Sequence, residues 1–201
     1  MSEFSTFVQL GLRHILDVRG LDHVLFLVAL AAIYRFSDWR QTIWVVTAFT
    51  VGHSITLAAA VLGYLPLSQS LVEFLIPLTI IATCVENIVA RNRLRMQTGR
   101  TYRPVFAVVF GLVHGAGFGS YLKSLFVDDA AVPLLGFNIG IELGQVGALL
   151  LIFVAMRALD SAFRLLPGRS DAASAMQARV VAVSAVVMVI AAKWATERAP
   201  W

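Results

Sequence analysis

Charged residues and cysteine are both scarce in this chain of 201 residues. Only 14% of the residues are charged, whereas 59% are hydrophobic, and the mean hydropathy is +0.80. These values lie outside the ordinary range of soluble globular domains. The single cysteine, Cys84, excludes an intrachain disulfide framework and a metal site built from paired thiolates. The composition therefore predicts an all-α integral membrane protein.

Long apolar runs divide the chain into about six predicted spans. A bilayer requires roughly 20 predominantly apolar residues for each spanning helix, so a single transmembrane domain is expected to occupy residues 1–201. Residues 4–15 have apolar side chains at helical spacing and are expected to form an N-terminal amphipathic helix along the membrane interface. The predicted spans are residues 21–34, 41–62, 70–90, 103–122, 132–159 and 179–194.

Basic residues gather in the first, third and fifth connections between these spans. Lys and Arg in short loops are retained on the cytoplasmic side, so the alternation predicts that both termini face outward, away from the cytoplasm. The N-terminal sequence lacks the basic region and cleavage site of a removable signal, so residue 1 is expected to belong to the mature protein. The sequence pI is near 9.7, but no nucleic-acid-binding motif is present, and nucleic acid is not expected as a partner.

All four histidines lie within the predicted spans or just before the first span. A titratable group at bilayer depth costs on the order of 3 kcal/mol, so each of these imidazoles requires a partner. His53, His114 and Glu142 lie about ten residues from the outer ends of their spans, or roughly 15 Å deep. Asp22 and His23 lie nearer the outer mouth, and a bend at Gly20 would let His14 fold back toward them. A shared site is therefore geometrically possible.

Imidazole nitrogens and carboxylate oxygens together form a ligand set for divalent zinc, nickel, cobalt or iron. We predict that a metal ion is held by members of one group: His14, Asp22, His23, His53, His114 and Glu142. The predicted supporting polar residues are Ser54, Asn138 and Gln145. In the alternative interpretation, Asp22 caps a helix, His14 meets lipid headgroups, and each buried imidazole bridges two helices. Glu86 is expected to pair with the arginine cluster of residues 91–95 in the third connection.

Five strings of this sequence, in this order, resemble the HupE/UreJ family of bacterial membrane proteins. They are Leu12–Asp17, Gly20–Phe26, Thr50–Leu57, Phe110–Phe118 and Phe137–Gln145, within a likeness that extends from Phe7 to about Ile152. The resemblance implies a helical membrane fold in a bacterial inner membrane. It also implies a role in the movement of nickel or cobalt linked to hydrogenase and urease maturation.

Two functions of different classes are consistent with the predicted site. In the first, the chain is a transition-metal permease in which His14, Asp22 and His23 capture an ion that His53, His114 and Glu142 then hold at mid-membrane. No inverted repeat or pair of broken helices of the usual transporter kind is recognisable in the sequence.

The second candidate is an intramembrane zinc-dependent hydrolase. Zinc lowers the pKa of a bound water to about 7, and Glu142 would take the proton of that water. A structural or accessory subunit without a bound ion is a third possibility, but it would leave the placement of the histidines unexplained. The expected partners are the metal ion and the lipid bilayer, and the formation of a homo-oligomer is left open.

Overall fold

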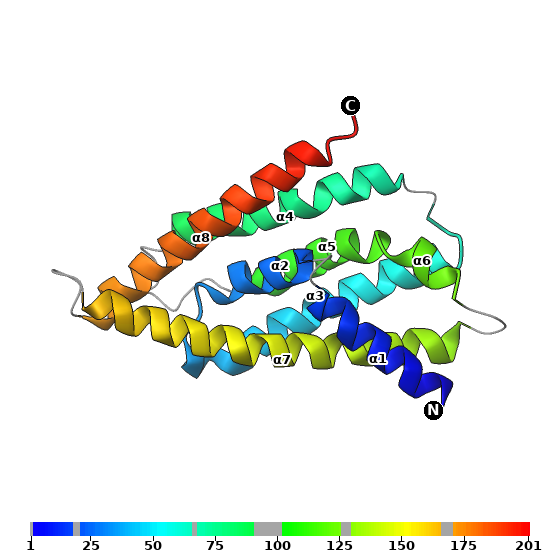
Figure 1. Cartoon of the computed structure of the whole chain (residues 1–201), viewed down its shortest axis with the longest axis horizontal. Coiled ribbons are helices and arrows are strands. Elements are labelled where there is room, and N and C mark those ends of the chain that lie inside the picture. The colour runs from blue at the N-terminus through cyan, green and yellow to red at the C-terminus, as the bar shows by residue number, and fades with distance from the viewer. Residues whose placement is uncertain (1, 18–20, 66–67, 91–101, 126–129, 166–170) are drawn as a thin grey trace.

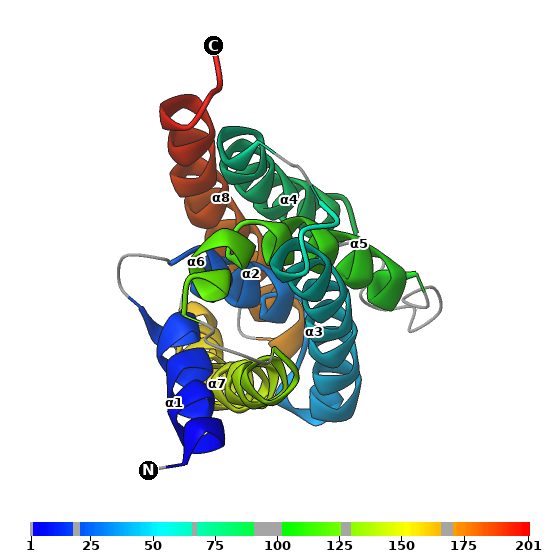
Figure 2. The ribbon, with the colours of Figure 1, turned by 90° about the vertical axis from the view of Figure 1, so that its right-hand side faces the viewer.

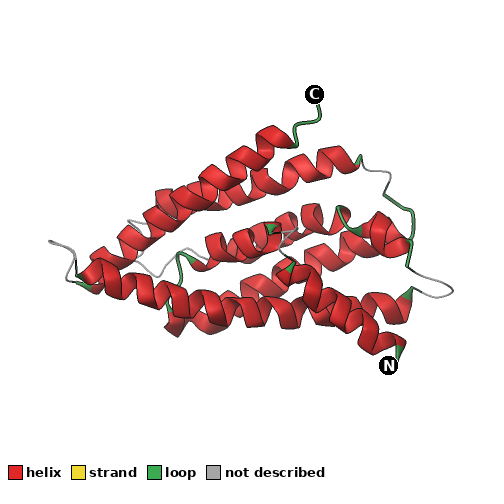
Figure 3. Ribbon diagram, in the orientation of Figure 1, coloured by secondary structure: helices red, strands yellow, loops and turns green. Residues whose placement is uncertain are grey.

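The computed structural model describes residues 2–17, 21–65, 68–90, 102–125, 130–165 and 171–201. Throughout these ranges the regular structure is helical, as Figure 3 shows, and they contain no strand. The helices are α1 (Glu3–Leu16), α2 (Asp22–Ala31), the 3-10 helix η1 (Phe36–Asp38), α3 (Trp39–Val61), α4 (Gln69–Ala90), α5 (Arg103–Ala116), α6 (Gly119–Lys123), α7 (Ala131–Arg164) and α8 (Ala172–Glu197).

Four stretches of helix are long and apolar enough to cross a membrane. These are Phe36–Val61, Gln69–Ala90, Ala131–Arg164 and Ala172–Glu197, so the chain is a multi-pass membrane protein. The other two predicted spans coincide with shorter apolar helices, α2 of 10 residues and α5 of 14. At 1.5 Å per residue, neither helix alone crosses a hydrocarbon core of roughly 30 Å. The count of six spanning helices is therefore not confirmed.

Two segments of the chain cross the bundle as pairs of short helices rather than as continuous helices. α1 is followed by α2, and α5 by α6, along the long axis of the molecule (Figure 1). The two pairs run in opposite directions. The predicted span 103–122 is thus divided, because α5 ends at Ala116 and α6 begins at Gly119. The predicted bend at Gly20 lies outside the described residues.

The N-terminal helix α1 packs lengthwise against the first half of α7, and Figure 2 shows the two side by side. Glycine makes this packing possible, because a Cβ added at Gly140 would lie 2.1 Å from the carbonyl oxygen of Val8. α3 and α5 pack in the same way. A Cβ at Gly111 would lie 2.1 Å from the carbonyl oxygen of Phe49 and 2.9 Å from the backbone nitrogen of His53. These contacts fix the registers of helices that carry histidine.

The short helix α2 lies near the centre of the bundle, where Figure 2 shows it surrounded by longer helices. Its C-terminal backbone carbonyls require donors because a helix leaves its last carbonyls unpaired. Asn87 on α4 donates from Nδ2 to the carbonyl oxygen of Ala29 at 2.6 Å. The buried side chain of Arg179 on α8 donates from Nη2 to the carbonyl oxygens of Ala32 and Tyr34, just beyond the helix, at 3.1 and 2.9 Å, and from Nη1 to Asp160 at 2.6 Å. α4 and α8 therefore anchor the C-terminal end of α2.

Both termini lie in the right half of Figure 1. Their placement outside the membrane stays a prediction, because the structure contains no bilayer. The third basic connection, at residues 91–101, and Arg169 in the fifth lie outside the described residues.

Candidate metal centre

The four histidines come from four helices and meet within the bundle. His14 lies in the last turn of α1 and His23 in the first turn of α2, while His53 and His114 lie in α3 and α5. The ring of His23 is central, with its centroid 4.8 Å from that of His14, 5.6 Å from that of His53 and 5.3 Å from that of His114. These four residues are called the imidazole cluster below.

Three members of the cluster approach the spacing of ligands to one ion. One ring nitrogen from each of His14, His23 and His53 lies within 4.8 Å of the other two. Because a metal–imidazole bond is about 2.0–2.1 Å, two nitrogens on the same ion lie at most about 4.2 Å apart. Small side-chain rotations would close the difference. The imidazole cluster therefore has the donor type and nearly the spacing that a divalent transition metal requires.

Several nitrogens of the cluster are buried and, within the described part of the chain, have no hydrogen-bond partner. They are Nε2 of His14, Nε2 of His23, both ring nitrogens of His53 and Nδ1 of His114. Leaving a buried polar atom without a partner costs about 1–3 kcal/mol. Several such atoms in one place indicate a site that is completed by an ion, by water or by both.

His114 is oriented by a hydrogen bond at its Nε2 atom. The hydroxyl of Thr79 on α4 donates to the carbonyl oxygen of Ile76 at 2.7 Å and lies 3.1 Å from Nε2 of His114. We assign the hydroxyl proton to that carbonyl, so that the oxygen accepts from Nε2–H. The lone pair of His114 is then on Nδ1, which is buried without a partner among the described residues. Such an orienting contact is typical of metal-binding imidazoles.

Asp22 lies beside the cluster but is held by a residue that the sequence analysis did not single out. Nη1 of Arg198 donates to both carboxylate oxygens of Asp22, at 3.1 and 3.2 Å. A signal was present in the sequence, because Arg198 follows the last span on the side where the loop charges predict few basic residues.

Glu142 faces α3 and is not part of the group of candidate ligand atoms. Its carboxylate accepts a hydrogen bond from the hydroxyl of Thr47. Two other polar residues of α7 also accept hydrogen bonds from hydroxyl groups of α3. Gln145 accepts from Thr50 and Asn138 accepts from Ser54, both at 2.7 Å. These polar residues of α7 therefore form a seam with α3. The predicted supporting residues Ser54, Asn138 and Gln145 all belong to it.

A cavity of about 290 Å³ leads to the imidazole cluster. His14, His23 and His114 line it, and so do the charged residues Asp22, Glu73 and Arg198. The volume is far larger than the roughly 30 Å³ that one water molecule occupies in the liquid, so the cavity can admit a hydrated ion.

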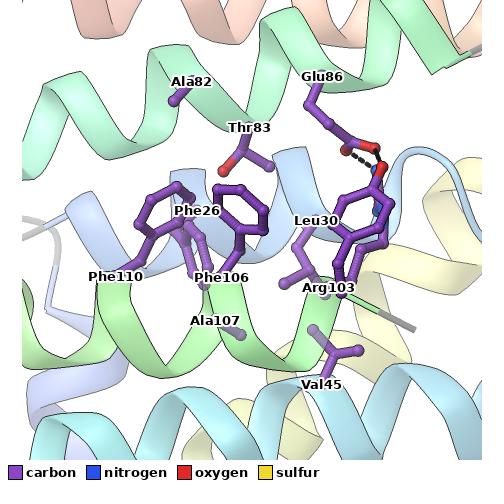
Figure 4. A pocket seen from close by; sticks show the side chains of 11 residues that line it. Phe26, Leu30, Val45, Ala82, Thr83, Glu86, Arg103, Phe106, Ala107 and Phe110 are labelled. Carbon is purple, nitrogen blue, oxygen red and sulfur yellow. Dashed lines mark hydrogen bonds and ion pairs between the residues drawn. The ribbon is translucent and has the colours of Figure 1, made fainter. Parts of the chain in front are cut away.

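A second cavity, of about 160 Å³, lies between α2, α4 and α5 and is lined mainly by apolar side chains such as Phe26, Leu30 and Phe110 (Figure 4). None of the histidines lines it. At one end of it, Glu86 is paired with Arg103 and accepts a hydrogen bond from Tyr102 at 2.6 Å. The arginine partner of Glu86 is thus Arg103, at the start of α5, whereas the predicted partners at residues 91–95 lie outside the described residues.

Comparison with known protein families matches residues 1–198 to the family described as HupE / UreJ protein. The chain belongs to the HupE/UreJ family. No curated protein and no solved structure matches the chain.

In this HupE/UreJ protein, the motifs that carried the resemblance have two different structural roles. The strings around His14, His23, His53 and His114 supply the imidazole cluster. The string Phe137–Gln145 supplies the α7 side of the polar seam and the glycine contact with α1. The cluster is thus assembled by four strings, while the fifth supports the helices that hold it.

Proposed function

We propose that this HupE/UreJ protein is a permease for a divalent transition-metal ion of the nickel or cobalt type. The imidazole cluster is the proposed ion-binding site, with His14, His23 and His53 as ligands and His114 as the adjoining fourth. The observation that carries the proposal is the convergence of four imidazoles whose buried nitrogens lack partners among the described residues. Neutral imidazole nitrogens suit nickel and cobalt, and also zinc and ferrous iron. Nickel and cobalt are preferred because of the family resemblance.

The divided helices support transport rather than a purely structural role. Secondary transporters commonly bind their substrates where discontinuous helices are interrupted, near the middle of the membrane. Here His14 lies just before the interval between α1 and α2, Asp22 and His23 open α2, and His114 lies in the last turn of α5. Three of the four imidazoles therefore lie at helix ends, whereas His53 lies within α3, so modest movements of the short helices would change the spacing of the cluster.

The hydrolase alternative has less support from the same geometry. Its proposed base, Glu142, bonds to Thr47 on α3 and is absent from the group of candidate ligand atoms. The other predicted carboxylate, Asp22, is ion-paired with Arg198. Glu142 thus lies outside the group of candidate ligand atoms and Asp22 is engaged by Arg198, so the structure favours neither carboxylate as the base for a metal-bound water.

Uptake by reconstituted protein tests the proposal. Liposomes containing the purified chain should accumulate Ni²⁺ or Co²⁺ faster than protein-free liposomes, and the His23→Ala variant should lose most of this uptake. Glu86→Gln is the matched control, because Glu86 lies by the apolar cavity and its substitution should leave uptake largely intact. Equal uptake by protein-free liposomes and by liposomes with wild-type protein would contradict the permease.

A further inference from the structure

A positive charge lies in the cavity through which the proposed cargo, also positive, would reach the imidazole cluster. Arg198 lines this cavity, and its Nη1 holds both oxygens of Asp22. Like charges repel, and the repulsion is stronger in a partly buried site than in water. Arg198 therefore opposes cation binding at Asp22 for as long as it remains in this position.

The position of Arg198 would allow its side chain to leave Asp22 without unfolding a helix. α8 ends at Glu197, so Arg198 is the residue that follows it. The guanidinium carbon lies 5.1 Å from the centre of the Trp194 ring, a cation–π contact. The side chain is 26% exposed, whereas that of Asp22 is 15% exposed. One aromatic contact and one carboxylate thus hold a partly exposed guanidinium at the cavity.

A second carboxylate lies on the same cavity and could receive the displaced guanidinium. Glu73 on α4 lines the cavity with Asp22 and Arg198, and one of its oxygens accepts a hydrogen bond from Gln69 at 3.0 Å. Transfer of Arg198 from Asp22 toward Glu73 would keep the guanidinium paired. It would also leave Asp22 available to a bound ion next to His23.

We propose that Arg198 is a specificity-determining residue, a tethered cation that occupies Asp22 until a divalent metal ion displaces it. This inference rests on the proposed function. A monovalent ion would replace one unit of charge by another and would gain little from imidazole ligands. A divalent transition metal brings a second charge and coordinates imidazole nitrogen strongly. Arg198 thereby excludes abundant monovalent cations from the mouth and weakens divalent binding by a fixed factor.

Calorimetric titration of Ni²⁺ into the detergent-purified full chain tests this role. Arg198→Gln should bind Ni²⁺ about tenfold more tightly than wild type, as expected for removal of a competing charge worth about 1.4 kcal/mol. Arg198→Lys keeps the charge and should remain close to wild type. Lys193→Gln is the matched control. Lys193 is an exposed cation on α8, close to Arg198 in the sequence, and it pairs with Glu197 rather than with Asp22.

The monovalent ion provides a second readout. Replacing N-methyl-D-glucamine chloride by sodium chloride at constant ionic strength should weaken Ni²⁺ binding to Arg198→Gln and leave wild type unchanged. In an Asp22→Asn background, Arg198→Gln should have no further effect. Unchanged or weaker Ni²⁺ binding by monodisperse Arg198→Gln would overturn the inference while leaving the permease intact. If wild type binds no Ni²⁺, the proposed function fails, and the inference fails with it.

Discussion

At the scale of single residues, the site is defined by which polar atoms have partners and which do not. Thr79 satisfies Nε2 of His114 and leaves Nδ1 as a buried acceptor. The sequence predicted His114 as a ligand but gave no indication that a threonine on another helix would orient it. Such contacts join residues that are far apart in the chain, so the local spacing of residues cannot predict them.

Thr79→Val should lower the affinity for the metal ion about 10–100-fold, because His114 loses the group that fixes its tautomer and orientation. Calorimetric titration of the purified variant measures the change. Thr83→Val is the matched control, since Thr83 lies one turn further along α4 and its hydroxyl donates to the backbone oxygen of Thr79 at 2.9 Å. Similar affinities for the two variants would refute an orienting role for Thr79.

At the scale of helices, apolar periodicity predicted the long elements well and the divided ones poorly. The segment predicted as 41–62 is α3, from Trp39 to Val61, and the segment predicted as 70–90 is α4, from Gln69 to Ala90. The span predicted as 103–122 is interrupted beyond Ala116, although its residues remain apolar. Hydropathy indicates which residues are buried in lipid or protein, but it does not indicate at which residue a helix ends.

Gly111→Ala should lower the apparent melting temperature and weaken metal retention, because the new Cβ would collide with the backbone of α3 beside His53. Overpacking of this kind costs about 1–3 kcal/mol. Gly147→Ala is a sensitive control, since a Cβ there meets no atom within 4 Å. Alanine is the better helix former by about 1 kcal/mol, so the control should be neutral or stabilising. Equal melting temperatures for the two variants would rule out the close contact of α3 with α5.

At the scale of the whole molecule, composition and hydropathy predicted the membrane class of the chain, but not its internal arrangement. The predicted N-terminal amphipathic helix corresponds to α1, from Glu3 to Leu16, and this helix packs along α7 within the bundle. The glycines at 136, 140 and 144 have the spacing of a groove for a neighbouring helix, and that neighbour is α1. The identity of that neighbour could not be inferred, because several apolar helices would fit a groove of small residues equally well.

The predicted topology places both termini outside and the third and fifth connections in the cytoplasm. With Cys84 replaced by Ser, single cysteines at positions 64, 95 and 169 should react differently with a membrane-impermeant maleimide. In intact cells the reagent should label Tyr64→Cys, in the second connection, and should label Arg95→Cys and Arg169→Cys only after lysis. Labelling of positions 95 and 169 from opposite sides would contradict the topology.

The central claim is that the imidazole cluster holds one transition-metal ion, and metal stoichiometry in detergent-purified protein tests it most directly. Elemental analysis after equilibration with Ni²⁺ should give about one ion per wild-type chain. Glu86→Gln should retain that value. His53→Ala removes a ligand with two buried, unpartnered nitrogens among the described residues, and its affinity should fall at least about tenfold. Equal stoichiometry in monodisperse His53→Ala and wild type under limiting Ni²⁺ would contradict the metal centre.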